Sequence, residues 1–388
     1  MAGTVNSVMD SVRNTYSDAA RQRQESLCCP VTYDPKYLKA IPREVLERDY
    51  GCGDPSQFVR SGETVLDLGS GGGKICFIAA QVVGSAGRVI GVDMTDDMLE
   101  LARRSKPLVA REIGYDNIDF RKGMIQDLRV DLADSETFLA SHPIANLADL
   151  HRFEINQQQQ RQERPLVADE SVDVIVSNCV LNLVAPADKA RMFTEMFRVL
   201  RTGGRVAISD IVSDEDVPAD LRSDPELWSG CVSGALREDE FLEAFERAGF
   251  FGIHLAKRDS TPWRTVRGIE FRSVTVTAHK GKQGPCLERN QAVVYAGPWK
   301  QVVDDDGHIL LRGKRMAVCD KTFRIMTSPL GPYARDIYGI EPTTQVSAEQ
   351  IEPFTCKGIS LRAARQTKGH GYTASTGAVE SCTTDGCC

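Results

Sequence analysis

Short apolar runs alternate with longer segments of helical periodicity through the middle of the chain, which has 388 residues. The apolar runs are rich in Val, Ile and Leu, as buried strands are, and cover residues 64–68, 88–92, 118–121, 172–177 and 205–209. The segments between them repeat apolar residues at amphipathic spacing, over residues 74–83, 96–114 and 189–200. This alternation of strand and helix predicts an α/β fold with a doubly wound, Rossmann-like sheet.

The pattern predicts further regions around this core. Residues 1–60 form an N-terminal segment, in which apolar positions recur at helical spacing before loops that contain proline and glycine. Residues 61–283 make up the central domain, interrupted at about residues 128–170 by a polar, glutamine-rich insertion that we expect to be helical or partly disordered. Alternating runs on both sides of Asp305–Gly307 predict a small β-rich domain at residues 284–358.

Composition narrows the classes of function. The net charge is −7, which argues against a broad nucleic-acid surface, and no apolar run approaches the roughly 20 residues of a membrane helix. The first residues lack the basic and apolar segments of a secretory signal, so we expect a cytoplasmic protein. Its 12 cysteines are then metal-binding, catalytic or incidental rather than disulfide-bonded. The composition of residues 359–388 predicts a flexible tail that contains cysteines. Nothing in the sequence requires an oligomer, so we expect a monomer.

A glycine-rich turn follows the first strand, in the sequence Asp67-Leu68-Gly69-Ser70-Gly71-Gly72-Gly73. Its glycines allow a tight turn and the close approach of a ligand, a pattern that also serves NAD, FAD or packing alone. Asp67 at the strand end can meet the ammonium of an amino-acid moiety, and Asp93 at the end of the second strand can bind ribose hydroxyls. The alternative is that Asp67 only caps the turn and Asp93 is a solvated loop residue.

The two acids together favour S-adenosylmethionine over a dinucleotide, because dinucleotide turns usually lack the leading carboxylate. The candidate cofactor-binding residues share a place at the carboxyl ends of the strands: Asp67, Gly69, Ser70, Gly71, Asp93, Met94, Ile125, Gln126 and Asn178. Among them, Ile125 and Gln126 follow the third strand and would border an adenine.

Three cysteines lie in predicted loops beside glycine or asparagine. Cys179 follows the strand 172–177 at its carboxyl end, on the edge of the sheet where ligands bind. Cys52 has a glycine on each side and Cys231 follows a glycine, so both lie where unusual backbone angles are permitted. Thiols gathered around a nucleotide cofactor would suit a soft atom, although spacing alone leaves incidental roles open. The lack of a CxxC pair argues against a tetrahedral structural zinc.

These motifs resemble those of the arsenite S-adenosylmethionine methyltransferases, which belong to the class I methyltransferases. The resemblance extends over about residues 28–280 and rests on the segments Asp49–Gly53, Asp67–Gly73, Gly91–Thr95, Ser177–Val184 and Leu227–Ala235. The segments around Cys179 and Cys231 are absent from methyltransferases in general. By the same resemblance, Tyr50 joins the cofactor-binding residues, over the methionine part of S-adenosylmethionine.

The resemblance also implies a catalytic set of cysteines. Cys52, Cys179 and Cys231 would bind trivalent arsenic as thiolates, since As(III) is soft and prefers sulfur ligands. Cys28 or Cys29 would relay a disulfide, which a thiol reductant, glutathione or thioredoxin, would then reduce. Arsenite and methylarsenite are the implied substrates, S-adenosylmethionine is the implied methyl donor, and arsenic detoxification is the implied role.

Two other interpretations stay open. A class I methyltransferase for a small organic acceptor would leave the cysteines incidental and would need a base near the methyl group, yet the histidines have no motif context. A thiol protein that binds or senses metalloids would need no cofactor, which Asp67 and Asp93 argue against. The insertion at residues 128–170 is longer than the resemblance leads us to expect, and it could be a lid, a partner surface or an inert excursion.

Overall fold

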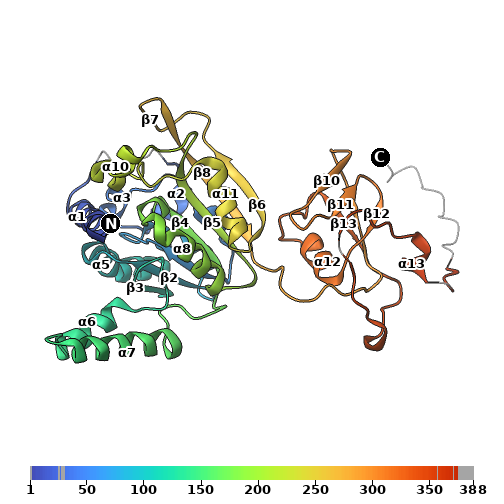
Figure 1. Cartoon of the computed structure of the whole chain (residues 1–388), viewed down its shortest axis with the longest axis horizontal. Coiled ribbons are helices and arrows are strands. Elements are labelled where there is room, and N and C mark those ends of the chain that lie inside the picture. Colours follow the sequence, from blue (N-terminus) through green and yellow to red (C-terminus); the bar gives the residue numbers. More distant parts are fainter. Residues whose placement is uncertain (1, 25–26, 28–30, 356, 370, 375–388) are drawn as a thin grey trace. The chain divides into compact units, whose positions relative to one another are not determined.

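The structure is a computed structural model that describes the chain except for residues 1, 25–26, 28–30, 356, 370 and 375–388 (Figure 1). The chain forms two compact units, residues 1–281 and residues 282–388. Within the described residues, the first unit contains one large sheet and the second contains two small ones.

The large sheet has the strand order β3-β2-β1-β4-β5-β8-β6, and β7 pairs with β8. Its strands are β1 (Thr64–Leu68), β2 (Arg88–Asp93), β3 (Ile118–Lys122), β4 (Val172–Asn178), β5 (Leu200–Ser213), β6 (Phe251–Arg258), β7 (Arg264–Val266) and β8 (Ile269–His279). Strands β1 to β5 are parallel, whereas β8 runs antiparallel to β5 and β6 antiparallel to β8. The predicted α/β, Rossmann-like sheet is therefore confirmed, with an antiparallel edge added to its parallel strands.

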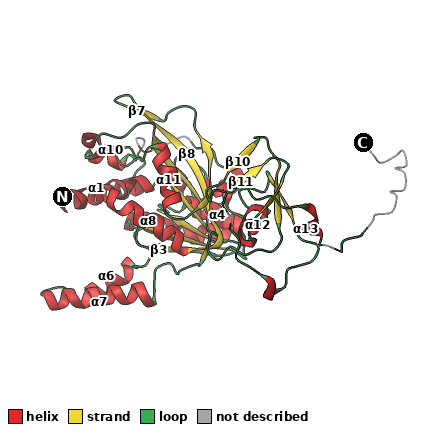
Figure 2. Ribbon diagram, turned by 45° about the vertical axis from the view of Figure 1, so that its right-hand side comes forward, coloured by secondary structure: helices red, strands yellow, loops and turns green. Residues whose placement is uncertain are grey.

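Helices cover both faces of this sheet (Figure 2). On one face, α4 (Lys74–Val83) and α5 (Asp96–Ile113) share a hydrophobic core with the strands. On the other face, α8 (Pro186–Val199) and α11 (Glu238–Arg247) contribute methionine and phenylalanine side chains to a second core. Because helices cover both faces, the central strands are apolar along most of their length. Polar side chains that could bind a ligand therefore lie where the strands end.

Further helices of the first unit lie outside the strand–helix repeat, among them α1 (Ala2–Arg21), α2 (Pro35–Leu38), α3 (Arg43–Glu47), α9 (Ala219–Arg222) and α10 (Pro225–Ser229). Helix α1 packs against both α5 and α10. Helix α10 begins at a proline, and the carboxylate of Asp224 caps it by accepting the backbone N–H groups of Glu226 and Leu227. Since α10 ends just before Cys231, α1 ties the start of the chain to the loop of that cysteine.

The polar insertion folds into two helices, α6 (Leu132–Ser141) and α7 (Leu147–Glu163). Asp131 and Asn146 cap them, each through a side-chain oxygen that accepts two backbone N–H groups. In α7 the one buried residue is Gln160, whose amide donates to Asp134 at 2.6 Å. The helical form of the prediction is thus correct for this insertion, and α7 is polar because it faces little core.

The second unit is β-rich, as predicted. Its elements are β9 (Ala292–Tyr295), β10 (Gln301–Val303), β11 (Ile309–Leu311), β12 (Arg315–Ala317), α12 (Asp320–Thr327), β13 (Ile337–Ile340) and α13 (Ala364–Lys368). Strands β10 and β11 form an antiparallel hairpin, and β12, β9 and β13 form an antiparallel sheet. The hairpin turn includes the predicted Asp305–Gly307, and the N–H of Gly307 donates to the backbone oxygen of Asp304 at 3.0 Å.

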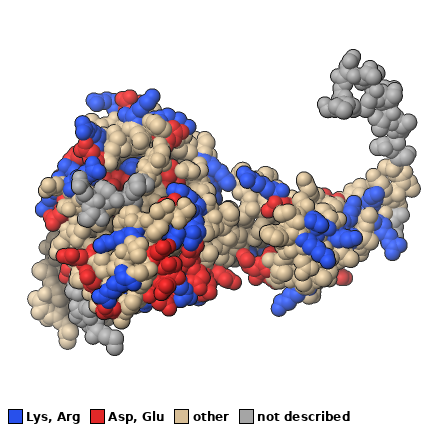
Figure 3. Space-filling model, turned by 90° about the horizontal axis from the view of Figure 1, so that it is seen from above, with Lys and Arg blue, Asp and Glu red and all other residues tan. Residues whose placement is uncertain are grey.

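On the face shown in Figure 3, basic and acidic side chains are interspersed over the surface of each unit. Many charged side chains of the described chain form ion pairs, such as those of Arg237 with Asp216 at 2.8 Å and with Asp239 at 2.6 Å. Among the described residues, no helix has the length and apolar character needed to span a bilayer.

Candidate active site

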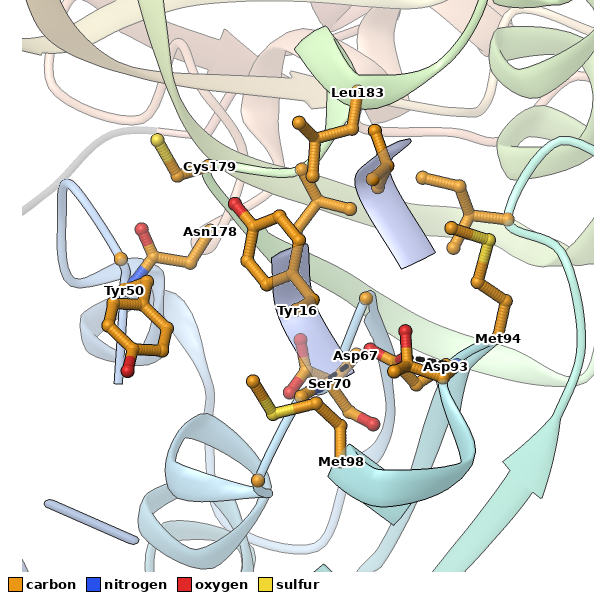
Figure 4. Close-up of a pocket in the computed structure, with 18 of the residues that line it drawn as sticks. Tyr16, Tyr50, Asp67, Ser70, Asp93, Met94, Met98, Asn178, Cys179 and Leu183 are labelled. Carbon is orange, nitrogen blue, oxygen red and sulfur yellow. Dashed lines mark hydrogen bonds between the residues drawn. The ribbon is translucent and has the colours of Figure 1, made fainter. Parts of the chain in front are cut away.

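A cavity of about 120 Å³ lies at the carboxyl ends of β1, β2 and β4 (Figure 4). All of the predicted cofactor-binding residues line it, together with Cys179: Tyr50, Asp67, Gly69, Ser70, Gly71, Asp93, Met94, Ile125, Gln126 and Asn178. The edge of the sheet therefore gathers into one site residues that are far apart in the chain.

The glycine turn after β1 forms part of the cavity wall. Gly69 and Gly71 have φ angles of 72° and 51°, in the left-handed region that glycine adopts without steric cost. A Cβ at Gly69 would lie 2.4 Å from the side chain of Val180, so the packing of this turn requires glycine there. The turn is thus held close to the loop that carries Cys179.

Asp67 is a buried carboxylate, 2% exposed, that forms no ion pair with any described basic side chain. Burial raises its pKa to about 7, and the thiol of Cys76, which donates a hydrogen bond to Oδ2 at 3.2 Å, opposes this rise. An unpaired charge is costly in a desolvated site, and a bound cation would relieve that cost. Asp67 therefore fits the ammonium group of an amino-acid ligand.

Asp93 and Ser70 present polar groups to the same cavity. The carboxylate of Asp93 accepts hydrogen bonds from the N–H groups of Gly71 at 2.9 Å and Thr95 at 2.8 Å. Burial raises the pKa of Asp93, and these hydrogen bonds oppose the rise. The buried hydroxyl of Ser70 has no hydrogen-bond partner in the described part of the chain. Since buried hydroxyls rarely stay unsatisfied, this one fits a cavity that a polar ligand completes.

Cys52, Cys179 and Cys231 lie in one apolar cluster and are 3%, 5% and 5% exposed. The thiol of Cys231 donates a hydrogen bond to the backbone oxygen of Cys179 at 3.2 Å. In the described chain, the three sulfur atoms do not all lie within 4.8 Å of one another. A single atom bound by all three would therefore draw the loops together.

Two thiols of this cluster, those of Cys52 and Cys179, have raised pKa values and are protonated at neutral pH. Burial raises the pKa of Cys52, and the negative charge of Asp210 adds to that rise. Hydrogen bonds with Cys231 and Cys52, together with burial, raise the pKa of Cys179 well above its ordinary value. Such a neutral, desolvated cluster favours an uncharged ligand over an anion.

The loops of Cys179 and Cys231 share an unusual backbone form. Their φ angles are 63° and 60°, in the left-handed region that few residues other than glycine adopt. The N–H of Cys179 donates to the backbone oxygen of Ser209 at 2.8 Å. The side-chain amide of Asn182 joins the two loops by donating to the oxygens of Ile211 at 2.6 Å and Cys231 at 3.2 Å. These bonds hold both cysteines in the strained form, which costs about 1 kcal/mol or more for each.

Asn178 holds the Cys52 loop against the end of β4. Its Oδ1 accepts the N–H groups of Cys52 at 2.9 Å and Gly53 at 3.0 Å, and its Nδ2 donates to the oxygen of Gly53 at 2.7 Å. The hydroxyl of Ser273 donates to the oxygen of Cys52 at 2.7 Å. A Cβ at Gly51 would lie 2.1 Å from the Asn178 amide, so glycine is needed for this approach. Asn178 borders the cavity, but the protein backbone engages its amide.

Tyr16 of α1 is a site residue that the sequence did not single out. Its ring lines the cavity, and in Figure 4 it lies between Cys179 and the glycine turn. Burial raises the pKa of its phenol, and Cys231 and Cys179 raise it further, so the hydroxyl is neutral. The ring meets that of Tyr50 edge-on, with centroids 6.3 Å apart. Tyr16 belongs to the apolar positions at helical spacing in the N-terminal segment, and that spacing carries no sign of what α1 covers.

Cys28 and Cys29, the predicted relay thiols, lie outside the described residues. The described cysteines all carry free thiols: Cys52, Cys76, Cys179, Cys231, Cys286 and Cys319. Cys76 of α4 is fully buried, and its thiol donates to the cofactor-site carboxylate of Asp67.

Residues 59–149 and 144–249 match a family described as a methyltransferase domain, and residues 282–372 match a domain of unknown function. An arsenite methyltransferase of Aquipseudomonas alcaligenes is 32% identical over 336 residues, covering 82% of this chain and 87% of that protein. One from Halobacterium salinarum is 41% identical, over 59% of this chain and 50% of that protein. Among solved structures, an arsenic(III) S-adenosylmethionine methyltransferase of Chlamydomonas reinhardtii has 28% identity and a TM-score of 0.55, covering 82% of this chain and 99% of that one.

Proposed function

Because the chain belongs to the arsenite methyltransferases, a family of S-adenosylmethionine-dependent enzymes, we propose that its buried thiols hold trivalent arsenic while it is methylated. The observation that carries the proposal is the shared cluster of Cys52, Cys179 and Cys231, of which Cys179 also lines the cavity of Asp67 and Asp93. Three thiolates suit As(III), which prefers sulfur to oxygen or nitrogen ligands. The cavity and the cluster would then hold the methyl donor and the methyl acceptor side by side.

We assign the cavity to S-adenosylmethionine. Asp67 would take its ammonium group, Asp93 its ribose hydroxyls, and Tyr50 would cover its methionine part. The residues that would border the adenine are Met94, Ile125 and Gln126. The unpaired carboxylate of Asp67 and the unsatisfied hydroxyl of Ser70 support this assignment. When bound, S-adenosylmethionine supplies an electrophilic methyl group, and the chain's own part is to orient the reactants and exclude water.

Arsenous acid, As(OH)3, can enter the cluster without bringing a charge. Three thiols exchange with three hydroxyls to give As(SCys)3 and three water molecules, so each thiol proton leaves on a hydroxyl. The raised pKa values of Cys52 and Cys179 support this neutral exchange, which needs no general base. An anion such as arsenate would lose its hydration in the same apolar surroundings without compensation.

Methylation uses the lone pair of arsenic to form the As–C bond, while the electrons of the broken C–S bond stay on the donor sulfur. Arsenic changes formally from As(III) to As(V), and the product is the cation CH3–As(SCys)3⁺. A fourth thiol then attacks one arsenic-bound sulfur, forms a disulfide, releases one proton and returns two electrons to arsenic. The remaining species is CH3–As(SCys)2, so each methyl group replaces one thiolate and methylarsenite needs fewer cysteines.

We propose Cys28 or Cys29 as this fourth thiol, and glutathione or thioredoxin as the external reductant of the disulfide. The enzyme would act on arsenite and methylarsenite as a monomer in the cytoplasm, and its role would be arsenic detoxification. The relay thiol, the reductant and the substrates are proposed from the resemblance of the cysteine motifs. They do not depend on the assignment of the cavity to S-adenosylmethionine.

The test is methyl transfer from labelled S-adenosylmethionine to arsenite with glutathione or thioredoxin present, followed by separation of the arsenic species. We expect methylated arsenic from the natural protein and none from Cys179→Ser or Cys231→Ser, both of which should still bind the cofactor. Cys286→Ser, in the second unit, is the matched control and should keep full activity. Unchanged turnover in both site variants would refute the thiolate mechanism. Cofactor binding without any transfer to arsenic would instead favour an organic acceptor.

A further inference from the structure

Asp210 is a buried carboxylate beside the thiol cluster. It is 0% exposed and follows Ser209, whose backbone oxygen accepts the N–H of Cys179. Strands β4 and β5 are parallel, with Asn178 paired to Ser209. Asp210 follows the last residue of β5 that pairs with β4, and Cys179 follows the last residue of β4 with a φ of 63°, so the two residues lie at the same end of this strand pair.

Backbone N–H groups, rather than an ion pair, hold this carboxylate. Its Oδ2 accepts the N–H of Leu181 and its Oδ1 accepts the N–H of Ile211, both at 2.8 Å. No basic side chain of the described chain lies within 4.0 Å of it, and the ammonium of Lys189 instead donates to the backbone oxygen of Leu181 at 2.7 Å. Burial raises the pKa of Asp210 to about 6, while these N–H groups and the field of Lys189 oppose the rise. The carboxylate is thus charged at pH 7.5.

The hydrogen bonds that hold the loop do not by themselves require a charged side chain at this position. Burying an ion without a partner costs several kcal/mol, and a neutral oxygen can accept backbone N–H groups at lower cost. The field of Asp210 reaches the arsenic half of the site, since its negative charge raises the pKa of Cys52 and of the Tyr16 phenol. A fixed negative charge beside a neutral thiol cluster favours whatever positive charge appears there.

We propose that Asp210 stabilises the positive charge that arsenic acquires when it is methylated. The inference rests on the proposed function, in which neutral As(SCys)3 becomes CH3–As(SCys)3⁺ as the donor sulfonium becomes a neutral thioether. One positive charge therefore moves to the arsenic during the step, toward the end of β5. A preorganised carboxylate lowers the energy of that charge in a site from which water is excluded. Asp210 acts through its field, as a positioned charge, and its effect belongs to the methyl-transfer step rather than to arsenite binding.

The test compares three variants. Asp210→Asn keeps the shape and removes the charge, and Asp210→Glu keeps the charge. The control is Asp173→Asn, which removes a carboxylate near the start of β4, where it accepts the N–H of Thr64 at 2.8 Å. Arsenite affinity without cofactor is measured by tryptophan fluorescence, since Trp228 lies just before the Cys231 loop and donates to the oxygen of Leu183 at 3.2 Å. The methyl-transfer rate is measured in a single turnover at pH 7.5 with both substrates saturating.

We expect Asp210→Asn to bind arsenite within about threefold of the natural protein and to transfer methyl about 10- to 100-fold more slowly. Asp210→Glu should recover most of that rate, whereas Asp173→Asn should leave both the arsenite affinity and the saturated rate nearly unchanged. If Asp210→Asn does not fold, Asp210→Ser, which keeps one oxygen acceptor, takes its place. A full rate in the neutral variant would overturn the proposal, as would a loss confined to arsenite affinity or an equal loss in Asp210→Glu. If the natural protein binds arsenite but never methylates it, the proposed function itself falls, and this inference with it.

Discussion

The side-chain oxygen of Asn178 accepts the backbone N–H of Cys52 at 2.9 Å, across 126 residues of sequence. Asn178 directly precedes Cys179, so one amide group fixes the separation of two of the cluster's thiols. The other hydrogen bonds of that amide go to Gly53 and to the hydroxyl of Tyr33, which keeps it from turning toward the cavity. Asn178 therefore both lines the cofactor cavity and positions the Cys52 loop of the thiol cluster.

Asn178→Ala should release the Cys52 loop and weaken arsenite binding. Several hydrogen bonds are lost, and we expect a loss of about tenfold or more in arsenite affinity, with a change of less than about threefold for S-adenosylmethionine. Calorimetric titration with arsenite and with S-adenosylmethionine measures the two affinities. Asn117→Ala is the matched control, because that amide donates to the backbone oxygen of Gly84 at 2.9 Å and lies outside the cavity lining. Equal effects of the two substitutions on arsenite would contradict the role given to Asn178.

Cofactor binding should depend on pH through Asp67. Its pKa is about 7 in the free protein, and a bound ammonium group lowers it, so binding below pH 7 releases a proton. Affinity should therefore rise as pH increases from 6 to 7, by up to about tenfold. Asp67→Asn should lower the affinity and remove this dependence, which calorimetry in two buffers of different ionisation enthalpy detects. A proton count that is the same in both proteins would exclude Asp67 as the titrating group.

The same carboxylate should lower the stability of the free protein at neutral pH. Because its pKa is raised in the folded state, the native chain holds the proton more tightly than the unfolded chain does, and stability falls as pH rises from about 4 through 7. At pH 8, Asp67→Asn should raise the free energy of unfolding by about 1–4 kcal/mol in the absence of cofactor. Thermal unfolding at pH 5 and pH 8 provides the comparison, and the gain should shrink at the lower pH.

Two glycines on either side of Cys231 should respond differently to alanine. A Cβ at Gly234 would lie 1.9 Å from the backbone oxygen of Asn182, whereas the nearest atom to a Cβ at Gly230 would be 3.4 Å away. Gly234→Ala should displace the Cys231 loop, lower arsenite affinity and cost about 1–3 kcal/mol of stability. Gly230→Ala should change both quantities little, and denaturant unfolding with arsenite titration measures them. A neutral result at Gly234 would mean that the loop moves freely.

Arsenite binding should exchange no protons with the buffer near pH 7. Protonated thiols give their protons to the departing hydroxyls, so the calorimetric enthalpy should vary with buffer by no more than the error of the fit. Uptake of two or three protons would show that the thiols are ionised before arsenic arrives, because the departing hydroxyls would then take protons from the buffer. The contrast with cofactor binding, which releases a proton below pH 7, provides an internal control in the same protein.

The sequence predicts those parts of the fold that local pattern determines. Strands such as β1 and β4 are continuous apolar runs, and Cys179 could be placed at the sheet edge because it follows one of them. Strand β6 escaped prediction because its exposed positions carry no regular alternation; its pairing with β8 creates it. The strand predicted at residues 205–209 is longer in the structure, because β5 begins at Leu200 and includes an irregular stretch with Gly203 at a φ of 88°.

The parts of the site that could not be predicted depend on contacts between distant segments. Nothing near Tyr16 in the chain shows that its ring will lie beside Cys179, since that contact requires α1 to pack on α10 and α5. The sequence also did not identify Asp210 as a site residue. Its role depends on its burial and on the N–H of Leu181, which comes from another loop. Residue type and spacing identify candidate ligands, whereas the groups that orient them and set their charge emerge only when the chain is folded.

The burial of Cys52, Cys179 and Cys231 as thiols has a consequence for the idle enzyme. Peroxide and other cellular oxidants attack the thiolate, and they reach exposed sulfur first. These cysteines are only 3% to 5% exposed, and two of them have raised pKa values, so they react slowly when no arsenic is present. A protein that meets its substrate rarely can thus remain intact between exposures, ready to bind without first being repaired.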